Sequence, residues 1–416
     1  MRVLYIHQFF ADRESSLGLI RSYEFSRRLI EAGHEVVMVS SSSRLPASFS
    51  ERLFARGDVD GIDVRSVRVD YSNYMGYGRR ILSFLKFMFG ATWLAASAPR
   101  PDVVIATSTP LTVGFPGWAA AALRRAPFVF EVRDLWPEAA FQMGALRRRG
   151  LLGRLAKALE RFLYRRSAAV IALSPGMAAG VVEEGVPSGR VHMIPNCCDL
   201  DLFSPGGKDP ELVARFGLEG RFVAGYAGAV GPSNALEAQV PEAARVLRDR
   251  GRDDVVFLIV GEGRSLSALR AEVQRLGVGD GVVLAGPMPK RDIPRVTRTA
   301  DALMTLFADV PILATNSPNK FFDALASGRP VIVNSGGWTR DIVTEEEAGL
   351  YVPPGDGTAL ADAVERLADD AELTERLGRN ARRVAEQRYG RDLQAALFIG
   401  VLEEAAGSRG GGDRRA

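Results

Sequence analysis

Short apolar runs alternate with longer amphipathic stretches along most of the chain. In the first half, runs with the length and composition of buried strands lie at residues 3–7, 36–40, 64–69, 103–106, 128–131 and 170–173. Between the first two runs, residues 20–32 repeat apolar positions at helical spacing and end at Gly33. Strands separated by helices predict a parallel sheet with right-handed crossovers. We therefore expect a doubly wound α/β domain in this half.

The same pattern restarts after a stretch at 199–210 that is rich in Asp, Pro and Gly and is typical of a linker. Strands are expected at 222–226, 255–260, 282–285, 302–307 and 331–334, and helices at 236–248 and 266–276. With 416 residues the chain is too long for one ordinary core. We predict domains at 1–198 and 199–388, a final amphipathic helix at 389–406 and a disordered tail at 407–416.

Residues 317–330 have the signature of one short helix. Ser317 is expected to cap it with Pro318 at the first helical position, and Gly328 and Pro330 end it. Lys320 and Asp323 stand three residues apart and therefore leave the same side of the helix. An ammonium at the positive end of a helix forms an anion site, and a carboxylate one turn later can accept from two hydroxyls. Anion plus diol describes a nucleoside diphosphate with its ribose; the alternative is an ordinary surface ion pair.

Glycine-rich or charged turns follow several predicted strands. In the second half they are 228–234, which includes Gly228, Gly231, Ser233 and Asn234, then 261–264, 286–289 and 336–337. Glycines let backbone N–H groups approach a ligand, and Ser233 or Asn234 could cap the next helix. In the first half, a polar loop at 9–18 leads into 21–24, and strand 128–131 leads into Arg133, Asp134 and Trp136. Single turns often only connect elements, and the charged pair could be an interdomain salt bridge. Their place at strand ends favours binding sites.

Composition narrows the class of partner and the compartment. The net charge of +3 is small for this length, so a nucleic-acid partner is not expected. The only cysteines, Cys197 and Cys198, are adjacent, which argues against a structural disulfide and favours a reducing cytosol. Two Cys and three His show no metal-ligand spacing, so we expect no metal. The chain opens directly on a strand without a signal-peptide pattern.

The motifs together resemble a known family over essentially the whole length. They are the helix start at 21–24 with 33–36, Asp-Leu-Trp-Pro-Glu at 134–138, and the segments 191–196, 226–228, 259–263 and 317–320. The chain resembles retaining glycosyltransferases of family 4. Their GT-B fold implies two Rossmann-like domains facing across a cleft, with the last helix crossing back to the first domain. Within the family it is most similar to bacterial transferases that add amino sugars to polyprenyl-linked polysaccharide precursors.

This resemblance implies a role for individual residues. Asp323 stands where the family's glutamate contacts the ribose, Thr315 where another glutamate touches the sugar, and Arg133 where the family has a histidine. The usual basic pair is absent from 231–234, so Lys320 and Arg264 are expected to hold the diphosphate. The implied catalytic residues are Lys320, Arg133 and Asp134. The implied donor-binding residues are Asp323, Asn319, Ser317, Thr315, Gly228, Gly231, Gly263, Arg264, Pro287 and Met288. The implied acceptor residues are Gly18, Arg21, Glu24, Trp136 and Glu138.

The implied reaction moves a sugar, with retention, from a nucleotide sugar to a hydroxyl of a lipid-linked saccharide. The donor is expected to be a UDP-sugar, with an N-acetylated amino sugar as one candidate for the transferred group. No metal or other cofactor is expected. Two alternatives stay open: a soluble transferase that modifies a small metabolite, and a non-catalytic subunit that binds nucleotide sugars. A Rossmann dehydrogenase is disfavoured because no Gly-x-Gly-x-x-Gly follows the first strand.

Two helical stretches raise the question of a membrane. In residues 147–166, Leu151, Leu155, Leu159 and Phe162 share one face, and the rest carries seven Arg and one Lys against one Glu. Such a helix can lie on anionic lipid, or its apolar face can pack on the sheet. Residues 81–97 are apolar but contain Lys86 and are shorter than the ~20 residues of a membrane span. We expect a half-buried helix near a lipid-acceptor entrance and a cytoplasmic, peripheral protein.

Overall fold

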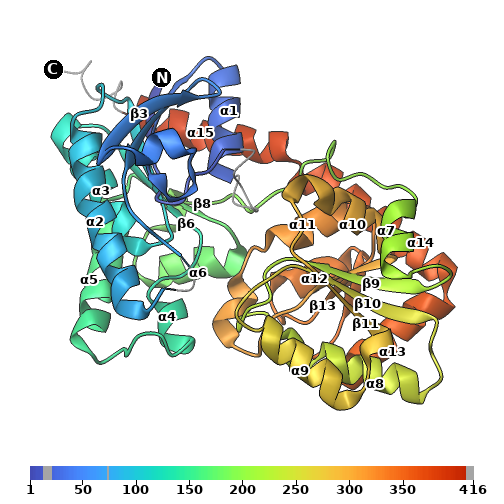
Figure 1. Cartoon of the computed structure of the whole chain (residues 1–416). Helices are drawn as coiled ribbons and strands as arrows, with labels where there is room; N and C mark the ends of the chain where they lie inside the picture. The colour runs from blue at the N-terminus through green and yellow to red at the C-terminus, as the bar shows by residue number, and fades with distance from the viewer. Residues whose placement is uncertain (13–20, 73–74, 409–416) are drawn as a thin grey trace. The chain divides into compact units, whose positions relative to one another are not determined.

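The computed structural model describes residues 1–12, 21–72 and 75–408. Its contacts divide the chain into two compact units (Figure 1). Unit 1 comprises Met1–Pro195 together with Asp392–Ala416, and unit 2 comprises Asn196–Arg391. Each unit is built around its own β-sheet.

The sheet of unit 1 has eight strands in the order β3-β4-β2-β1-β5-β6-β7-β8. They are β1 (Arg2–Ile6), β2 (Glu35–Ser41), β3 (Phe54–Val59), β4 (Ile62–Val67), β5 (Val103–Thr107), β6 (Phe128–Val132), β7 (Ala169–Ala172) and β8 (Val191–Met193). All neighbours are parallel except β3 and β4. The six strands predicted in this half are confirmed. The hairpin strand β3 was not predicted, because Arg56, Gly57 and Asp58 interrupt its apolar pattern.

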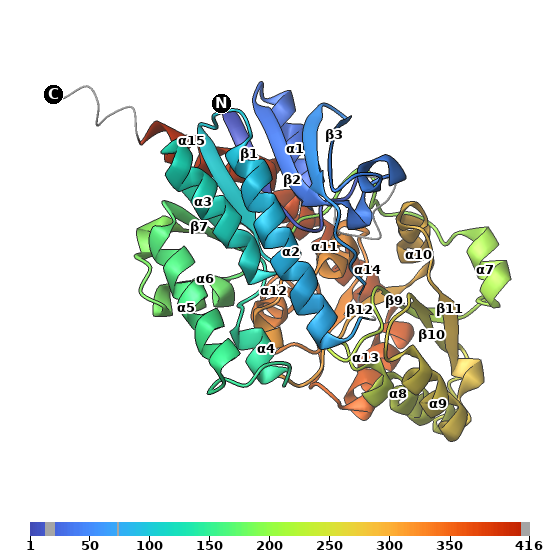
Figure 2. The ribbon, with the colours of Figure 1, turned by 60° about the vertical axis from the view of Figure 1, so that its left-hand side comes forward.

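Helices cover both faces of this sheet. They are α1 (Arg21–Glu31), α2 (Tyr77–Ala96), α3 (Gly114–Arg124), α4 (Glu138–Gln142), α5 (Leu151–Arg166), α6 (Pro175–Glu183) and α15 (Arg391–Gly407). Helices α2, α3 and α5 lie side by side on one face (Figure 2). On the other face, Phe25 of α1 and Tyr5 of β1 pack against Phe398 of α15, with ring centroids 4.9 and 6.0 Å from Phe398. None of the described helices combines the length and apolar character needed to cross a membrane.

The sheet of unit 2 has six parallel strands in the order β11-β10-β9-β12-β13-β14. They are β9 (Phe222–Ala227), β10 (Val255–Val260), β11 (Val282–Gly286), β12 (Ala302–Thr305), β13 (Val331–Val333) and β14 (Gly349–Tyr351). Its α-helices are α7 (Pro210–Phe216), α8 (Val240–Asp249), α9 (Leu266–Leu276), α10 (Ile293–Thr299), α11 (Asn319–Ala326), α12 (Trp338–Glu345), α13 (Gly357–Asp369) and α14 (Ala371–Val384). Alternate strand residues bury into two apolar clusters, one under α8, α9 and α13 and the other under α10, α11, α12 and α14.

Several boundaries differ from expectation in unit 2. The helix expected from residue 236 begins at Val240, after a separate turn at Leu236–Ala238. Neither proposed cap caps it, because Gln239 precedes its first turn and the Asn234 side chain donates to the Leu306 carbonyl. The short strand β14 was not predicted because it spans only three residues and begins with Gly349. Beyond Ser408 the predicted tail lies outside the described residues.

Candidate functional site

Helix α11 begins at the carboxyl edge of the unit 2 sheet, as the sequence predicted, but its start differs in detail. Pro318 occupies the capping position and Asn319 is the first helical residue. Ser317 is not a cap: its hydroxyl accepts from the Asn196 N–H at 3.0 Å, and its carbonyl accepts from the Asn196 side chain at 2.6 Å. The helix ends at Ala326, and Gly328 adopts the left-handed conformation, φ +64°, that closes it. The residue at the capping position, Pro318, therefore provides no side-chain cap.

Lys320 lies one residue into α11, and its ammonium is surrounded by aromatic rings. The Nζ atom donates to the Tyr226 hydroxyl at 2.5 Å, 4.2 Å from the centroid of that ring and 5.5 Å from that of Phe307. Among the described residues no carboxylate lies within ion-pair distance of Nζ. Burial lowers the pKa of Lys320 to about 7. A ligand anion would supply the missing counter-charge and favour the protonated amine.

The loops that follow β9 and β10 run against each other, backbone to backbone, beside Lys320. The N–H of Gly228 donates to the Val260 carbonyl, and the N–H of Val230 donates to the Glu262 carbonyl. A Cβ atom on Gly261 would stand 1.8 Å from the Gly228 carbonyl oxygen, so only glycine fits there. A Cβ atom on Gly228 would lie 3.7 Å from the Lys320 Nζ. Gly228 thus lies beside the ammonium, and Gly261 lets the second loop pack closely against Gly228.

Asp323 lies one turn further along α11 and is half-buried. No described residue donates a hydrogen bond to its carboxylate. Burial raises the pKa of Asp323 to about 6, although the charge of Lys290 opposes this shift. Lys290, in the turn after β11, was missed by the sequence reasoning because it lies four residues beyond the glycine that ends the strand. The unpartnered carboxylate keeps its acceptor oxygens available for ligand hydroxyls.

The other predicted donor-binding residues differ in burial and in contacts. The Thr315 hydroxyl donates to the Ile312 carbonyl at 2.8 Å. Met288 packs on the core, while Pro287 and Arg264 are exposed. A Cβ on Gly231 would meet open space, whereas one on Gly263 would stand 2.3 Å from the Val230 carbonyl oxygen. Within the described residues no group of three or more His, Cys, Asp or Glu could hold a metal ion.

In unit 1, Arg21 and Glu131 form a buried ion pair of 2.9 Å. Arg21 also donates to the carbonyls of Ile194 and Pro195, while Thr107 and Tyr5 donate to the Glu131 carboxylate. Burial opposes ionisation, yet Arg21 holds the pKa of Glu131 below its ordinary value. The structure therefore places Arg21 in the core of the unit rather than at a surface open to an acceptor.

Two further predicted acceptor residues are engaged by arginines. Glu24 is buried and pairs with Arg28 at 2.9 Å, and Glu138 pairs with Arg148. Trp136 is half-buried in the turn after β6. Gly18 lies outside the described residues.

Arg133 and Asp134 do stand at the carboxyl end of β6. The Asp134 carboxylate accepts from the Thr109 hydroxyl at 2.8 Å, and burial raises its pKa. The Arg133 N–H donates to the Ser108 hydroxyl at 3.0 Å. His7, which follows β1, was not singled out from sequence because it ends an apolar run; it is buried, and its Nδ1 lies 2.7 Å from the Ser22 hydroxyl.

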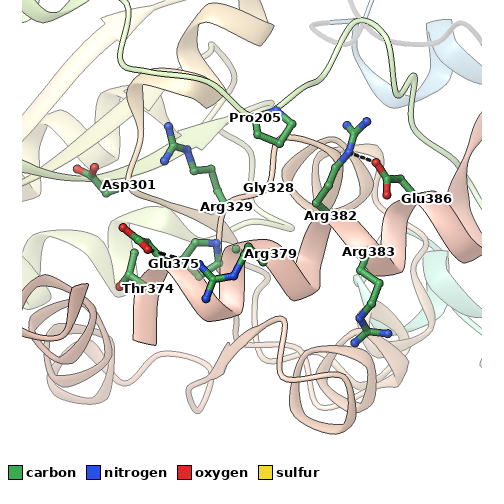
Figure 3. A pocket seen from close by; sticks show the side chains of 12 residues that line it. Pro205, Asp301, Gly328, Arg329, Thr374, Glu375, Arg379, Arg382, Arg383 and Glu386 are labelled. Carbon is green, nitrogen blue, oxygen red and sulfur yellow. Dashed lines mark hydrogen bonds and ion pairs between the residues drawn. The ribbon is translucent and has the colours of Figure 1, made fainter. Parts of the chain in front are cut away.

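A cavity of about 380 Å³ occupies a different part of unit 2 (Figure 3). Asp301, just before β12, and Pro330, just before β13, line it, so it lies at the amino edge of the sheet. Arg382 in this cavity pairs with Glu386, and Arg379 with Glu375 (Figure 3). Because Lys320 and the glycine loops belong to the carboxyl edge, this cavity is separate from the site predicted for the nucleotide.

Two family models match this chain. The glycosyl transferase 4-like domain matches residues 20–197, and the glycosyl transferases group 1 domain matches residues 221–370. Together they match most of the sequence, and the chain belongs to the glycosyltransferases that combine these two domains. The predicted family is thereby confirmed.

Individual relatives are more distant. The 2-deoxystreptamine glucosyltransferase of Streptomyces kanamyceticus is 30% identical over 248 residues, which cover 59% of this chain and 60% of the relative. A GDP-mannose-dependent alpha-mannosyltransferase of Mycobacterium tuberculosis is 26% identical over 276 residues, 65% of either chain. The chain thus spans less than two thirds of these relatives. Sucrose-phosphate synthase of Thermosynechococcus elongatus has a similar structure, with a TM-score of 0.75 at 19% identity over 97% of this chain and 98% of that protein. This likeness confirms the predicted GT-B class of fold.

Proposed function

We propose that the protein transfers a sugar from a nucleoside diphosphate sugar, with retention, to a hydroxyl of a lipid-linked saccharide. The observation that carries the donor half is the Lys320 ammonium, which lacks a carboxylate partner among the described residues and lies beside the glycine loops. In this proposal Lys320 and the first turn of α11, starting at Asn319, bind the diphosphate, and Asp323 accepts from the ribose hydroxyls. The GDP-mannose-dependent relative supports a nucleotide sugar in general; a UDP-sugar remains our expectation.

The proposed chemistry needs charge stabilisation and orientation rather than a strong base. The bond between the anomeric carbon and the diphosphate oxygen breaks, and the acceptor oxygen bonds to that carbon from the same face. The acceptor proton passes to the departing phosphate oxygen, so atoms and charges balance. A fixed ammonium next to the leaving group stabilises the negative charge that develops there, and a bound orientation supplies much of the rest. No metal takes part in the proposed step.

The lipid half of the proposal is supported by exposed apolar residues on α2. Leu82, Leu85, Phe89 and Trp93 follow one another at helical spacing, and Phe89 and Trp93 are each 67% exposed. The helix contains Arg79, Arg80 and Lys86 but no acidic residue. An apolar stripe flanked only by cations fits the surface of an anionic bilayer.

Helix α5 contributes less to such a surface than its sequence indicated. Leu151 and Leu155 are exposed, but Phe162 packs on Trp118 with ring centroids 4.8 Å apart. Lys157 pairs with Glu160 and Glu184, and Arg161 pairs with Glu184, so part of the basic charge is neutralised. The apolar face of this helix is therefore exposed at its first turns and packed on the protein at Phe162. Peripheral membrane contact through 147–166 remains a proposal.

The relative named for 2-deoxystreptamine favours a second candidate, transfer to a small metabolite. Two measurements on the full chain separate the candidates. A thermal-shift screen against UDP-, GDP- and dTDP-linked sugars identifies the donor, since a ligand that binds only the native state stabilises it. Transfer is then compared between a polyprenyl-linked saccharide in anionic vesicles and a water-soluble acceptor. Faster transfer in vesicles supports the lipid acceptor. Equal rates on both favour the metabolite, and stabilisation by none of the donors contradicts the proposal as a whole.

A further inference from the structure

Four residues with polar side chains lie at the carboxyl edge of the unit 1 sheet. His7 and Gln8 follow β1, Arg44 lies in the turn after β2, and Arg133 follows β6. Strands β2, β1, β5 and β6 are parallel neighbours in this order, so their carboxyl ends share one edge. Two of these four side chains are guanidinium groups.

Neither guanidinium forms an ion pair within the described part of the chain, although the charge of Arg133 acts on the carboxylates of Glu131 and Asp134. Both Arg44 and Arg133 are half-buried, and no described carboxylate or hydrogen-bond acceptor engages either guanidinium. The Arg44 guanidinium instead lies over the Phe9 ring, 5.5 Å from its centroid. The carboxylates nearest to Arg133 in sequence have other hydrogen-bond partners, since Glu131 pairs with Arg21 and Asp134 accepts from Thr109. This differs from Arg21, each of whose guanidinium nitrogens donates a hydrogen bond.

Gln8, at the same edge of the sheet, carries a buried side chain without hydrogen bonds to the described residues. Its side chain is fully buried, and among the described residues neither its amide oxygen nor its amide nitrogen has a hydrogen-bond partner. Its backbone is fixed, because the Gln8 carbonyl accepts from the hydroxyls of Ser40 and Ser41. A buried polar group without a partner costs about 1–3 kcal/mol, so such a group usually meets a ligand or an ordered water.

The positive charges of both arginines act on His7. Burial is the first cause that lowers the pKa of His7 well below its ordinary value, and the charges of Arg133 and Arg44 are the next. The same two guanidiniums also oppose each other, since burial and then Arg133 lower the pKa of Arg44 while Tyr71 opposes this shift. His7 is therefore neutral at physiological pH, and the local charge comes from the arginines.

We propose that Arg44 and Arg133, with the Gln8 amide, form a subsite for a phosphate group of the acceptor. Guanidinium groups match phosphate oxygens with paired N–H donors, and an amide N–H₂ adds a neutral donor. The assignment to the acceptor rests on the proposed function, in which unit 1 is the acceptor side. The phosphate has two sources, the diphosphate of a polyprenyl carrier or a phosphorylated small acceptor.

The test uses the full chain saturated with UDP, which fills the donor site, and inorganic phosphate as the titrant in calorimetry. Arg44→Gln and Arg133→Gln should each weaken phosphate binding about tenfold or more, while UDP affinity stays unchanged. The control is Arg379→Gln, an exposed arginine of the unit 2 cavity, which should change neither. Phosphate affinity that persists in both variants, or that is lost instead in Arg379→Gln, overturns the subsite.

Competition identifies the source of the phosphate. Displacement of inorganic phosphate by glucose 6-phosphate supports the subsite with a small phosphorylated acceptor. Displacement by farnesyl diphosphate in neutral micelles supports it with a lipid diphosphate. Displacement by neither contradicts an acceptor role. Failure of this subsite leaves the donor screen and the transfer assay intact, whereas failure of the proposed function appears as no donor binding at all.

Discussion

Replacing Lys320 by methionine tests the centre of the donor site. Methionine retains a flexible apolar chain that can pack on the rings of Tyr226 and Phe307, but it removes the ammonium. The Tyr226 hydroxyl still donates to the Ala229 carbonyl at 2.6 Å, so the loop keeps its brace. A charge-assisted hydrogen bond contributes about 1.5–3 kcal/mol, and 1.4 kcal/mol is a factor of ten in affinity. UDP should therefore bind about ten- to a hundredfold more weakly to Lys320→Met.

The pH dependence provides a second signature of the same residue. With a pKa of about 7 in the free protein, Lys320 must take up a proton to bind a diphosphate at higher pH. Affinity for UDP should then fall above pH 7, by up to about tenfold per pH unit, and Lys320→Met should lose this dependence. The stability of the free protein changes with pH in the opposite direction. Because the folded-state pKa lies below the ordinary 10.5, the unfolded chain binds more protons between these values, and the free protein gains stability as pH rises.

Calorimetric titrations of the wild type and Lys320→Met with UDP and with uridine, from pH 6.5 to 8.5, check both expectations. Uridine lacks the diphosphate, so its affinity should be the same in both proteins. Equal losses for UDP and uridine, or a pH dependence that survives the substitution, would show that Lys320 supports the fold and does not contact the diphosphate.

Three further predictions concern other residues. Asp323→Asn should bind UDP ten- to a hundredfold more weakly, with little effect on the binding of 2′,3′-dideoxy-UDP, which lacks the ribose hydroxyls. The affinity of the wild type for UDP should decline below about pH 6, as the carboxylate protonates. Equal losses of affinity for both nucleotides in calorimetry would remove Asp323 from the ribose site. Arg21→Met leaves Glu131 buried without its partner and should lower the free energy of unfolding by about 3–5 kcal/mol in urea titrations; a stability within 1 kcal/mol of wild type would refute a core role. The double variant of Phe89 and Trp93 to Ser should reduce sedimentation with anionic vesicles while transfer to a water-soluble acceptor persists, and undiminished sedimentation would exclude this surface.

The sequence predicted the architecture because each buried strand is a short apolar run between turns. It failed where strands carry charge or glycine, as at Gly57 in β3 and Gly349 in β14. The predicted helix caps were wrong for a different reason. Ser317 has the sequence pattern of a cap, but its hydroxyl is taken by the N–H of Asn196, which is 121 residues away in sequence. Only the tertiary structure decides such a competition.

Individual site residues were predicted unevenly. Lys320 and Asp323 could be singled out as candidates because spacing on one helix turn is a local property. Whether a charge is already neutralised is not local: Arg21 and Arg133 look alike in sequence, yet only Arg21 has a buried carboxylate partner. His7 and Gln8 were missed because polar residues at the end of an apolar strand resemble an ordinary transition to a loop.

The paired loops after β9 and β10 limit which substitutions can alter the substrate preference of this protein. Their mutual contacts are N–H to carbonyl bonds, and Gly261 leaves no room for a side chain. The wall beside Lys320 is therefore made of peptide groups, whose shape is independent of which residues occupy the other positions of the loops. Substitutions there can add or remove charge without moving the wall. A search for altered sugar or nucleotide preference is best directed at side chains outside it, such as Thr315, Met288 and Lys290, while Gly228, Gly261 and Gly263 are held constant.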